Sequence, residues 1–178
     1  MWEAGVKSVK SHIRRVVGDT VLTIEELQTL LTQVEGVLNN RPLCSNGFEF
    51  NDVLTPAHYL IGTKSIQLPQ SRVEHIPYNR LTHWQAIQKM LQILWRRWYN
   101  EYINTLQQRG KWKQDAENIK LNQIVLIKED NPLLNCWKMG RVVQLHTGTD
   151  GRVRVVTLKT IDGTIQRVIH KLCPLPVN

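Results

Sequence analysis

The first forty residues have the apolar spacing of two amphipathic helices. One apolar series recurs at three- and four-residue steps and consists of Val6, Val9, Ile13, Val16 and Val17. A second series has the same steps and consists of Leu27, Leu30, Leu31, Val34 and Leu38. Thr23, with Glu26 three residues later, forms a capping-box pattern before the second series. The spacing therefore predicts two helices, separated at Gly18 and Asp19 and stopped before Pro42.

A third helical pattern extends from about Asn79 to Gln108. Its apolar face consists of Trp84, Ile87, Leu91, Leu94, Trp98, Tyr102 and Leu106, and neither Gly nor Pro interrupts it. Such a helix spans roughly 45 Å at 1.5 Å per residue. It must lie across other elements or act as a rigid spacer. The segment before it contains several prolines and no sustained period, which predicts a connector with one helical turn at Pro56 to Leu60.

The last sixty residues show strand patterns. QIVLIK, KMGRVVQLH, RVRVVTLKT and GTIQRVI are rich in β-branched residues and partly alternate. Gly-Thr-Asp-Gly at 148–151 and Asp162-Gly163 separate the last three, and Asp-Gly is a strong hairpin signal. Four or five short strands suit a small barrel, because closure removes exposed apolar sheet edges. The chain as a whole is therefore predicted to be α+β.

Composition narrows the class of partner. The chain has 178 residues and a formal net charge of +8, which favours a polyanion such as nucleic acid or an anionic membrane surface. No window has the length of apolar sequence that a spanning helix needs, and the amino terminus lacks the pattern of a signal peptide. Three cysteines without metal-binding spacing argue for reduced thiols and against a zinc site. We expect an intracellular protein, nuclear or cytoplasmic.

Positive charge is denser in the strand region. After Gly110 there are 11 Lys and Arg against 6 Asp and Glu, compared with 12 against 9 before it. The basic residues that could form one phosphate-contacting face are Lys111, Lys113, Lys138, Arg141, Arg152, Arg154 and Lys159. Arg152 and Arg154 share a face if the strand alternates strictly. The alternative is a solvated outer surface. Trp112 and Trp137 either stack on bases or belong to the core.

Two helical positions carry further candidates. Arg96 and Arg97 lie on the long helix. They either form a solvated back face of that helix, contact a DNA backbone, or stack on an exposed Trp95.

In the first helix, Glu3, Lys7 and Lys10 follow i, i+4, i+7 spacing, and Arg14 is a further basic candidate. This stripe is either an ordinary ion-pair face or a metal-binding carboxylate beside phosphate-binding lysines.

The sequence resembles the carboxy-terminal part of integrases from the BEL/Pao group of LTR retrotransposons. The matching stretches are WEAGVKSVKSHIRRVVGD, TIEELQTLLTQVEGVLNNRPL, LTPAHYLIG, NRLTHWQAIQKM, WRRWYNEYINTLQQRGKW, GRVVQLHTGTDGRVRVVTLKT and KLCPLP. They are spread over nearly the whole chain in the order of the family. The part from about His83 onward resembles the domain of unassigned function that follows the integrase core.

The resemblance implies an RNase H-like catalytic core whose two Asp and one Glu hold two Mg²⁺ (or Mn²⁺) ions. It places the third carboxylate at Glu3 and contacts to viral DNA at Lys7 and Lys10. It further implies four parts: the last core helices at 1–42, a proline-rich connector at 43–78, a long helix at 79–110, and an SH3-like DNA-binding barrel at 111–178.

The departures from the family set the expected function. Both catalytic aspartates and the central sheet precede the motif at Glu3 in the family and have no counterpart here, so we expect no catalysis by this chain alone and no cofactor for it. We expect sequence-independent DNA binding, with self-association as in integrases, and neither membrane nor small-molecule binding.

Two alternatives remain. One is a multimerisation or protein-docking module. The other is a relic without function, whose amino-terminal helices lack the sheet they would cover and are poorly folded or prone to aggregation.

Overall fold

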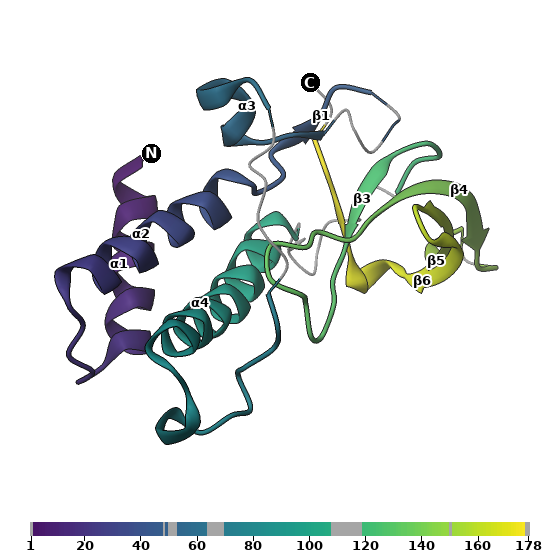
Figure 1. Ribbon diagram of the computed structural model, residues 1–178. Helices are drawn as coiled ribbons and strands as arrows, with labels where there is room; N and C mark the ends of the chain where they lie inside the picture. Colours follow the sequence, from purple (N-terminus) through teal and green to yellow (C-terminus); the bar gives the residue numbers. More distant parts are fainter. Residues whose placement is uncertain are drawn as a thin grey trace.

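The computed structural model describes residues 2–47, 49, 53–63, 70–107, 119–149 and 151–176, with side chains from residue 5 onward. The helices are α1 (Trp2–Val17), α2 (Ile24–Asn39), α3 (Pro56–Ile61) and α4 (His83–Leu106), with 3-10 turns η2 (Tyr78–Arg80) and η3 (Ile169–Lys171). The strands are β1 (Cys44–Ser45), β2 (Val53–Leu54), β3 (Ile124–Ile127), β4 (Met139–Thr147), β5 (Val153–Thr160), β6 (Gly163–Val168) and β7 (Leu172–Pro174). Figure 1 shows the helices on one side and the larger sheet on the other.

The predicted α+β class is confirmed. The five carboxy-terminal strands form one antiparallel sheet in the order β6-β5-β4-β3-β7, and β1 and β2 form a separate two-stranded sheet. Asp162 lies in the tight turn between β5 and β6, as the Asp-Gly signal predicted. Within the described residues β6 and β7 remain the two edges of the sheet, so its closure into an SH3-like barrel stays a prediction.

Local signals fix the helix ends. The predicted capping box is present, since the Glu26 N–H donates to the Thr23 hydroxyl at 3.2 Å and the Thr23 N–H donates to the Glu26 carboxylate at 2.8 Å. The long helix was predicted from about Asn79 but begins at His83, because η2 comes first and Thr82 forms its own capping box. A positive φ of 55° at Gly18 follows the end of α1.

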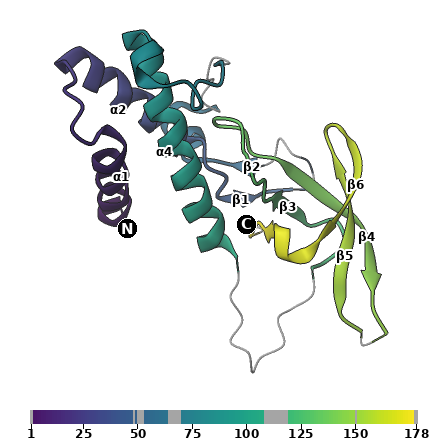
Figure 2. The same cartoon turned by 90° about the horizontal axis from the view of Figure 1, so that it is seen from below.

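Helix α4 lies across the other elements and is not a spacer. One core cluster includes Leu30, Val34 and Val37 of α2 and Leu91 and Leu94 of α4, and the apolar side of α1 packs against it. Figure 2 shows α1 and α2 on one side of α4 and the strands on the other. Helix α4 therefore covers part of the apolar sides that a central sheet was expected to cover, including Leu30 and Val34, while Val6, Leu27 and Leu31 of the predicted series stay 40–43% exposed.

The five-stranded sheet packs against the opposite side of α4. In β3, Ile124 and Leu126 belong to the core around α4, while Val125 and Ile127 belong to a second core within the sheet. Alternation along the strand thus sends successive side chains into two different cores. This explains why all four residues of β3 are buried and the strand has no polar position.

An aromatic cluster joins α4 to the loop before β4. Trp137 lies 5.1 Å from Trp95 and 5.2 Å from Tyr99, measured between ring centroids, and also contacts Trp98 and Tyr102. Trp137 is therefore a core residue and not a platform for bases. Trp95 is 1% exposed, so the stacking of an arginine on an exposed Trp95 is excluded as well.

Polar side chains of α4 hold the segment before it. The Gln92 side chain accepts from the Val73 N–H at 3.0 Å and donates to the Ser71 carbonyl at 2.8 Å. Lys89 donates to the Ile76 carbonyl and lies over the ring of Tyr78, 4.3 Å from its centroid. Lys89 and Gln92 are both buried, and buried polar groups need hydrogen-bond partners. Segment 70–78 supplies those partners for both side chains.

Substitutions at two adjacent leucines of α2 test whether this helix packs on α4. Leu30 is 1% exposed and Leu31 is 43% exposed. We predict that Leu30→Ala lowers the free energy of unfolding by about 2–5 kcal/mol, as expected for a buried leucine, whereas Leu31→Ala lowers it by less than about 1 kcal/mol. Chemical denaturation measures both. Equal effects of the two substitutions would contradict the packing.

The buried thiol of Cys173 makes stability fall in alkali. Burial raises its pKa from 9.0 to about 11, and the side chain is fully buried. The unfolded chain therefore loses this proton near pH 9 while the folded chain keeps it. The stabilisation is complete below pH 9 and is lost as pH rises toward 11, by about 2–3 kcal/mol in total.

Denaturation at a series of pH values measures this loss. Burial raises the pKa of Tyr102 to about 12, so its contribution begins at higher pH. The Cys173→Ala variant is expected to lose most of the slope between pH 9 and 10, and Cys136→Ala, at an exposed thiol, is expected to keep it. An unchanged slope in Cys173→Ala would refute the assignment.

Candidate nucleic-acid interface

The basic side chains of α1 face away from the molecule. His12 is buried against α4, where its Nε2 lies 2.5 Å from the Glu101 carboxylate, and Ser8 donates to the same carboxylate at 3.4 Å. At 100° per residue, Lys7, Lys10 and Arg14 lie on the side of α1 opposite His12. All three are exposed. We call these three residues the α1 stripe.

Within the described part of the chain, no ion pair engages the α1 stripe. Residues 5–17 contain four basic residues and no acidic one. Glu101, the nearest carboxylate of α4 to this helix, is turned to the other side, toward His12. The stripe therefore offers its full positive charge to a partner outside the chain.

Glu3, the predicted third carboxylate, lies in the first turn of α1, and its side chain is outside the described residues. Among the residues that are described, no three His, Cys, Asp or Glu side chains come together to hold a metal ion. Lys111, Lys113 and Trp112 also lie outside the described residues.

A second basic site lies on the sheet. Arg141 of β4 is the direct cross-strand partner of Lys159 of β5. Arg141 also pairs with Ile124 of β3, and Ile124 belongs to the core around α4. Arg141 and Lys159 therefore lie on the same face of the sheet as Ile124, which is the face that α4 partly covers. Opposed residues of this kind have Cα atoms about 4.5–5.5 Å apart, so their positive charges repel unless an anion lies nearby, as the Glu49 carboxylate does 3.4 Å from Arg141. We call Arg141 and Lys159 the strand cluster.

The rest of this sheet face is polar. Gln144 pairs with Thr157 and Lys159 pairs with Thr164, and the His146 ring lies 2.8 Å from the Thr157 hydroxyl. Such side chains form hydrogen bonds to phosphate and sugar oxygens as readily as to water. The face thus resembles a hydrophilic binding surface more than an apolar interface.

Strict alternation does not describe Arg152 and Arg154. Arg152 precedes β5, and Arg154 is the extra residue of a β-bulge, because His146 pairs with Val155 and Thr147 with Val153. Both side chains are exposed. A bulge re-aims the residue it inserts, so the sequence could not place Arg154 relative to Lys159.

Three predicted contacts already have carboxylate partners. Arg96 pairs with Glu74 at 2.5 Å, Lys138 with Glu129 at 3.3 Å, and Arg141 with Glu49 at 3.4 Å. Arg96 also donates to the Asn131 side chain at 3.3 Å, so it ties two loops to α4. Arg97 is exposed. A phosphate at any of the three paired residues has to compete with a neighbouring acid.

Charge is therefore divided along the described chain. The α1 end has four basic residues, as above. Residues 18–107 contain seven basic and eight acidic residues, and residues 119–176 contain nine basic and four acidic residues. The predicted site residues of α1 and of the strand region thus lie on either side, along the chain, of a near-neutral region that contains Arg96 and Arg97.

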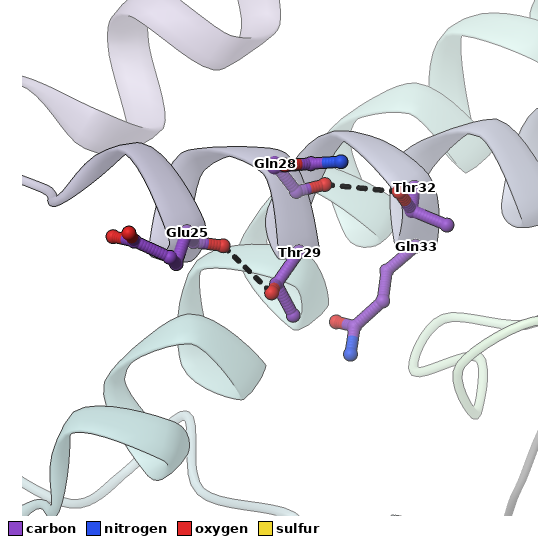
Figure 3. A pocket seen from close by; sticks show the side chains of 5 residues that line it. All are labelled: Glu25, Gln28, Thr29, Thr32 and Gln33. Carbon is purple, nitrogen blue, oxygen red and sulfur yellow. Dashed lines mark hydrogen bonds between the residues drawn. The ribbon is translucent and has the colours of Figure 1, made fainter.

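A depression on α2 offers no comparable chemistry. It has a volume of about 470 Å³ and is lined by Glu25, Gln28, Thr29, Thr32 and Gln33 (Figure 3). The Thr29 hydroxyl donates to the Glu25 carbonyl at 2.7 Å and the Thr32 hydroxyl to the Gln28 carbonyl at 3.0 Å. Hydrogen bonding to its own backbone N–H, and then to Thr23, lowers the pKa of the Glu25 carboxyl. The hydroxyls are engaged by their own helix, so no reactive group is presented.

Comparison with known proteins gives one match. Residues 82–175, which run from the cap of α4 to the end of the sheet, match the model of a family described as "Family of unknown function (DUF5641)". No curated protein and no solved structure matches this chain. Separately, none of the helices in the described ranges has both the length and the apolar character needed to cross a membrane.

Proposed function

Because this chain belongs to DUF5641, a family of unknown function, its role has to be inferred from its own surfaces, and we propose that it binds duplex DNA through phosphates without reading base sequence. The observation that carries this proposal is the accumulation of positive charge at two exposed places. Lys and Arg that neutralise phosphates release condensed counterions, and this supplies most of the affinity of non-specific DNA binding.

The kind of contact follows from the residues. The α1 stripe consists of separated, solvated cations, which suit phosphates along a backbone and carry no sequence information. The strand cluster places two cations side by side, of which Arg141 already pairs with Glu49 at 3.4 Å, so a phosphate there would compete with that carboxylate for Arg141. Thr157, Thr164 and Gln144 on the same face add neutral hydrogen-bonding groups for the sugar-phosphate backbone.

The more specific proposal is that the chain is the carboxy-terminal part of a retrotransposon integrase of the BEL/Pao type. The matching stretches described above support it, and so does their order along the chain. In that role α1 is the helix that opens with the catalytic glutamate, Glu3, and the sheet is the SH3-like DNA-binding domain. The chain then acts as a DNA-binding module in the nucleus or cytoplasm.

The described residues do not fit the magnesium site that this parentage implies. Two-metal sites need several converging carboxylates, and the described residues contain no such group. Asp19 follows α1 and is exposed, without other acids gathered around it in the described ranges.

A protein-interaction module is the second candidate, and one observation favours it. Helix α2 and the residues before it expose an apolar stripe on the side not used against α4, consisting of Val21, Ile24, Leu27 and Leu31, with exposed fractions of 93%, 82%, 41% and 43%. Exposed apolar stripes of this kind mark interaction sites. The long helix, by contrast, has most of its apolar face buried and is not free to dock.

We predict salt-sensitive binding to duplex DNA. With about six phosphate contacts, affinity falls about a thousandfold between roughly 50 and 200 mM salt. Fluorescence anisotropy with two duplexes of equal length and unrelated sequence measures this, and the two curves are expected to coincide. No binding at low salt, or affinity that does not change with salt, would overturn the proposal.

Charge reversal distinguishes the two candidates. If the chain binds DNA, changing Arg152, Arg154 and Lys159 to Glu strongly weakens binding and leaves the oligomeric state unchanged. Loss of the oligomer with DNA binding intact would favour the interaction module instead. Arg80→Glu, at an exposed position in the near-neutral region, serves as the control and is expected to change little.

A further inference from the structure

The two edges of the five-stranded sheet differ in how they are protected. The β7 edge is three residues long and contains Pro174, and just beyond it the Ser45 N–H donates to the Pro176 carbonyl at 2.9 Å. Short length and proline are devices that keep an edge strand from pairing with another chain. Strand β6 has neither device, because it is six residues long, contains no proline and pairs with β5 without a shift of register.

The register of the β5–β6 hairpin shows which backbone groups of β6 lack a strand partner. Thr160 pairs with Gly163 across a two-residue turn, and a pair that closes such a turn exchanges both of its backbone hydrogen bonds. Every second pair along the two strands does the same. The N–H groups of the residues between these pairs, Thr164, Gln166 and Val168, therefore point away from β5. No other strand of the described residues lies along this edge.

One outward-facing carbonyl of the β6 edge is satisfied by a neighbouring side chain. The Arg167 guanidinium donates to the Gln166 carbonyl at 3.0 Å. Both residues are exposed, so a local side chain occupies the position that the N–H of an added strand would take. An added strand replaces this bond by a backbone bond and releases the guanidinium to bind a carboxylate of that strand.

The side chains along this edge determine what kind of strand fits it. Ile165 is half-buried against the core within the sheet, so an apolar side chain placed beside it extends that core. Lys159 of β5 and Arg167 are exposed cations, and residues 119–176 contain nine basic and four acidic residues. A second copy of β6 brings the same positive charges to the edge, and like charges across an interface are unfavourable. Charge therefore favours an acidic strand over a second copy.

We propose that β6 binds an extended acidic peptide segment of a partner protein, which pairs with its outer edge and adds a strand to the sheet. Backbone hydrogen bonds to Thr164, Gln166 and Val168 supply affinity, and the side chains beside them select the sequence of the partner. The segment that fits alternates apolar residues, which lie beside Ile165, with acidic ones. This site does not depend on the proposed DNA binding, because it uses the backbone of β6 and not the α1 stripe or the strand cluster.

Two labelled peptides of strand length test the chemistry of the partner. One alternates valine with glutamate and the other alternates valine with lysine, so they share their apolar residues and differ in the sign of their charge. In fluorescence anisotropy with the full chain, we expect saturable binding of the glutamate peptide and an affinity about tenfold or more lower for the lysine peptide. Equal affinities, or no binding of the glutamate peptide, would overturn the proposal.

Gln166→Pro separates strand pairing from general attraction between a basic chain and an acidic peptide. Edge strands tolerate proline where the N–H faces solvent, so we expect the fold to persist. The affinity for the glutamate peptide is expected to fall about tenfold, because an outward N–H is lost and the ring blocks the edge. Gln166→Thr removes the same side chain, keeps the N–H and is expected to bind as wild type. Wild-type affinity in Gln166→Pro would show that the peptide does not pair with this edge.

Duplex DNA binding is measured on the same two variants. It is expected to be unchanged in both, since neither substitution removes a charge. Loss of peptide binding with DNA binding intact, or the reverse, therefore distinguishes failure of this proposal from failure of the proposed function.

Amide hydrogen exchange of the wild-type chain tests the edge without any substitution. In the unbound chain, the amides of Thr164, Gln166 and Val168 are expected to exchange faster than those of Ile165 and Arg167, which bond to β5. The glutamate peptide is expected to slow the first three. Absence of this slowing at saturating peptide would overturn the proposal. A wild-type dimer that Gln166→Pro converts to a monomer in sedimentation would overturn it too, because a second copy would then occupy the edge.

Discussion

The burial of α4 on several sides is the interaction on which the rest of this structure depends. Its middle turns place Met90, Leu91, Leu94, Trp95 and Tyr99 at 2% exposure or less. One side takes the apolar stripes of α1 and α2, another takes β3 and β7, and a third holds segment 70–78 through Lys89 and Gln92. A helix apolar over so much of its circumference is stable only when several elements cover it. Each covering element in turn depends on α4 for its own core.

Local chemistry could be read from the sequence, and long-range packing could not. The Thr23–Glu26 capping box, the Asp162 turn and the strand pattern depend on neighbours within a few residues, and the structure shows all three. Trp137 and Lys89 behave differently. Trp137 enters an aromatic cluster with residues some forty positions earlier, and Lys89 is buried because a segment without regular pattern covers it. Neither partner is visible in a local window.

The candidate site shows the same limit. The sequence names basic candidates but not the acids that lie beside them in the fold, so Arg96 was a candidate contact although Glu74 pairs with it. The sequence-based prediction assumed that side chains alternate strictly between the two sheet faces through Arg154, where a bulge changes the register. It also could not show that α1 and the strands lie on opposite sides of α4. That arrangement is what turns a generally basic chain into one with two separate positive surfaces.

Native-state hydrogen exchange tests the central role of α4 most directly. If one core joins α1, α2, α4 and β3, the slowest amides of all four exchange only through global unfolding and give the same free energy of opening. Slow exchange in α4 and β3 combined with exchange of α2 at a free energy several kcal/mol lower would contradict this account. It would show that the amino-terminal helices are only loosely attached to the rest of the protein.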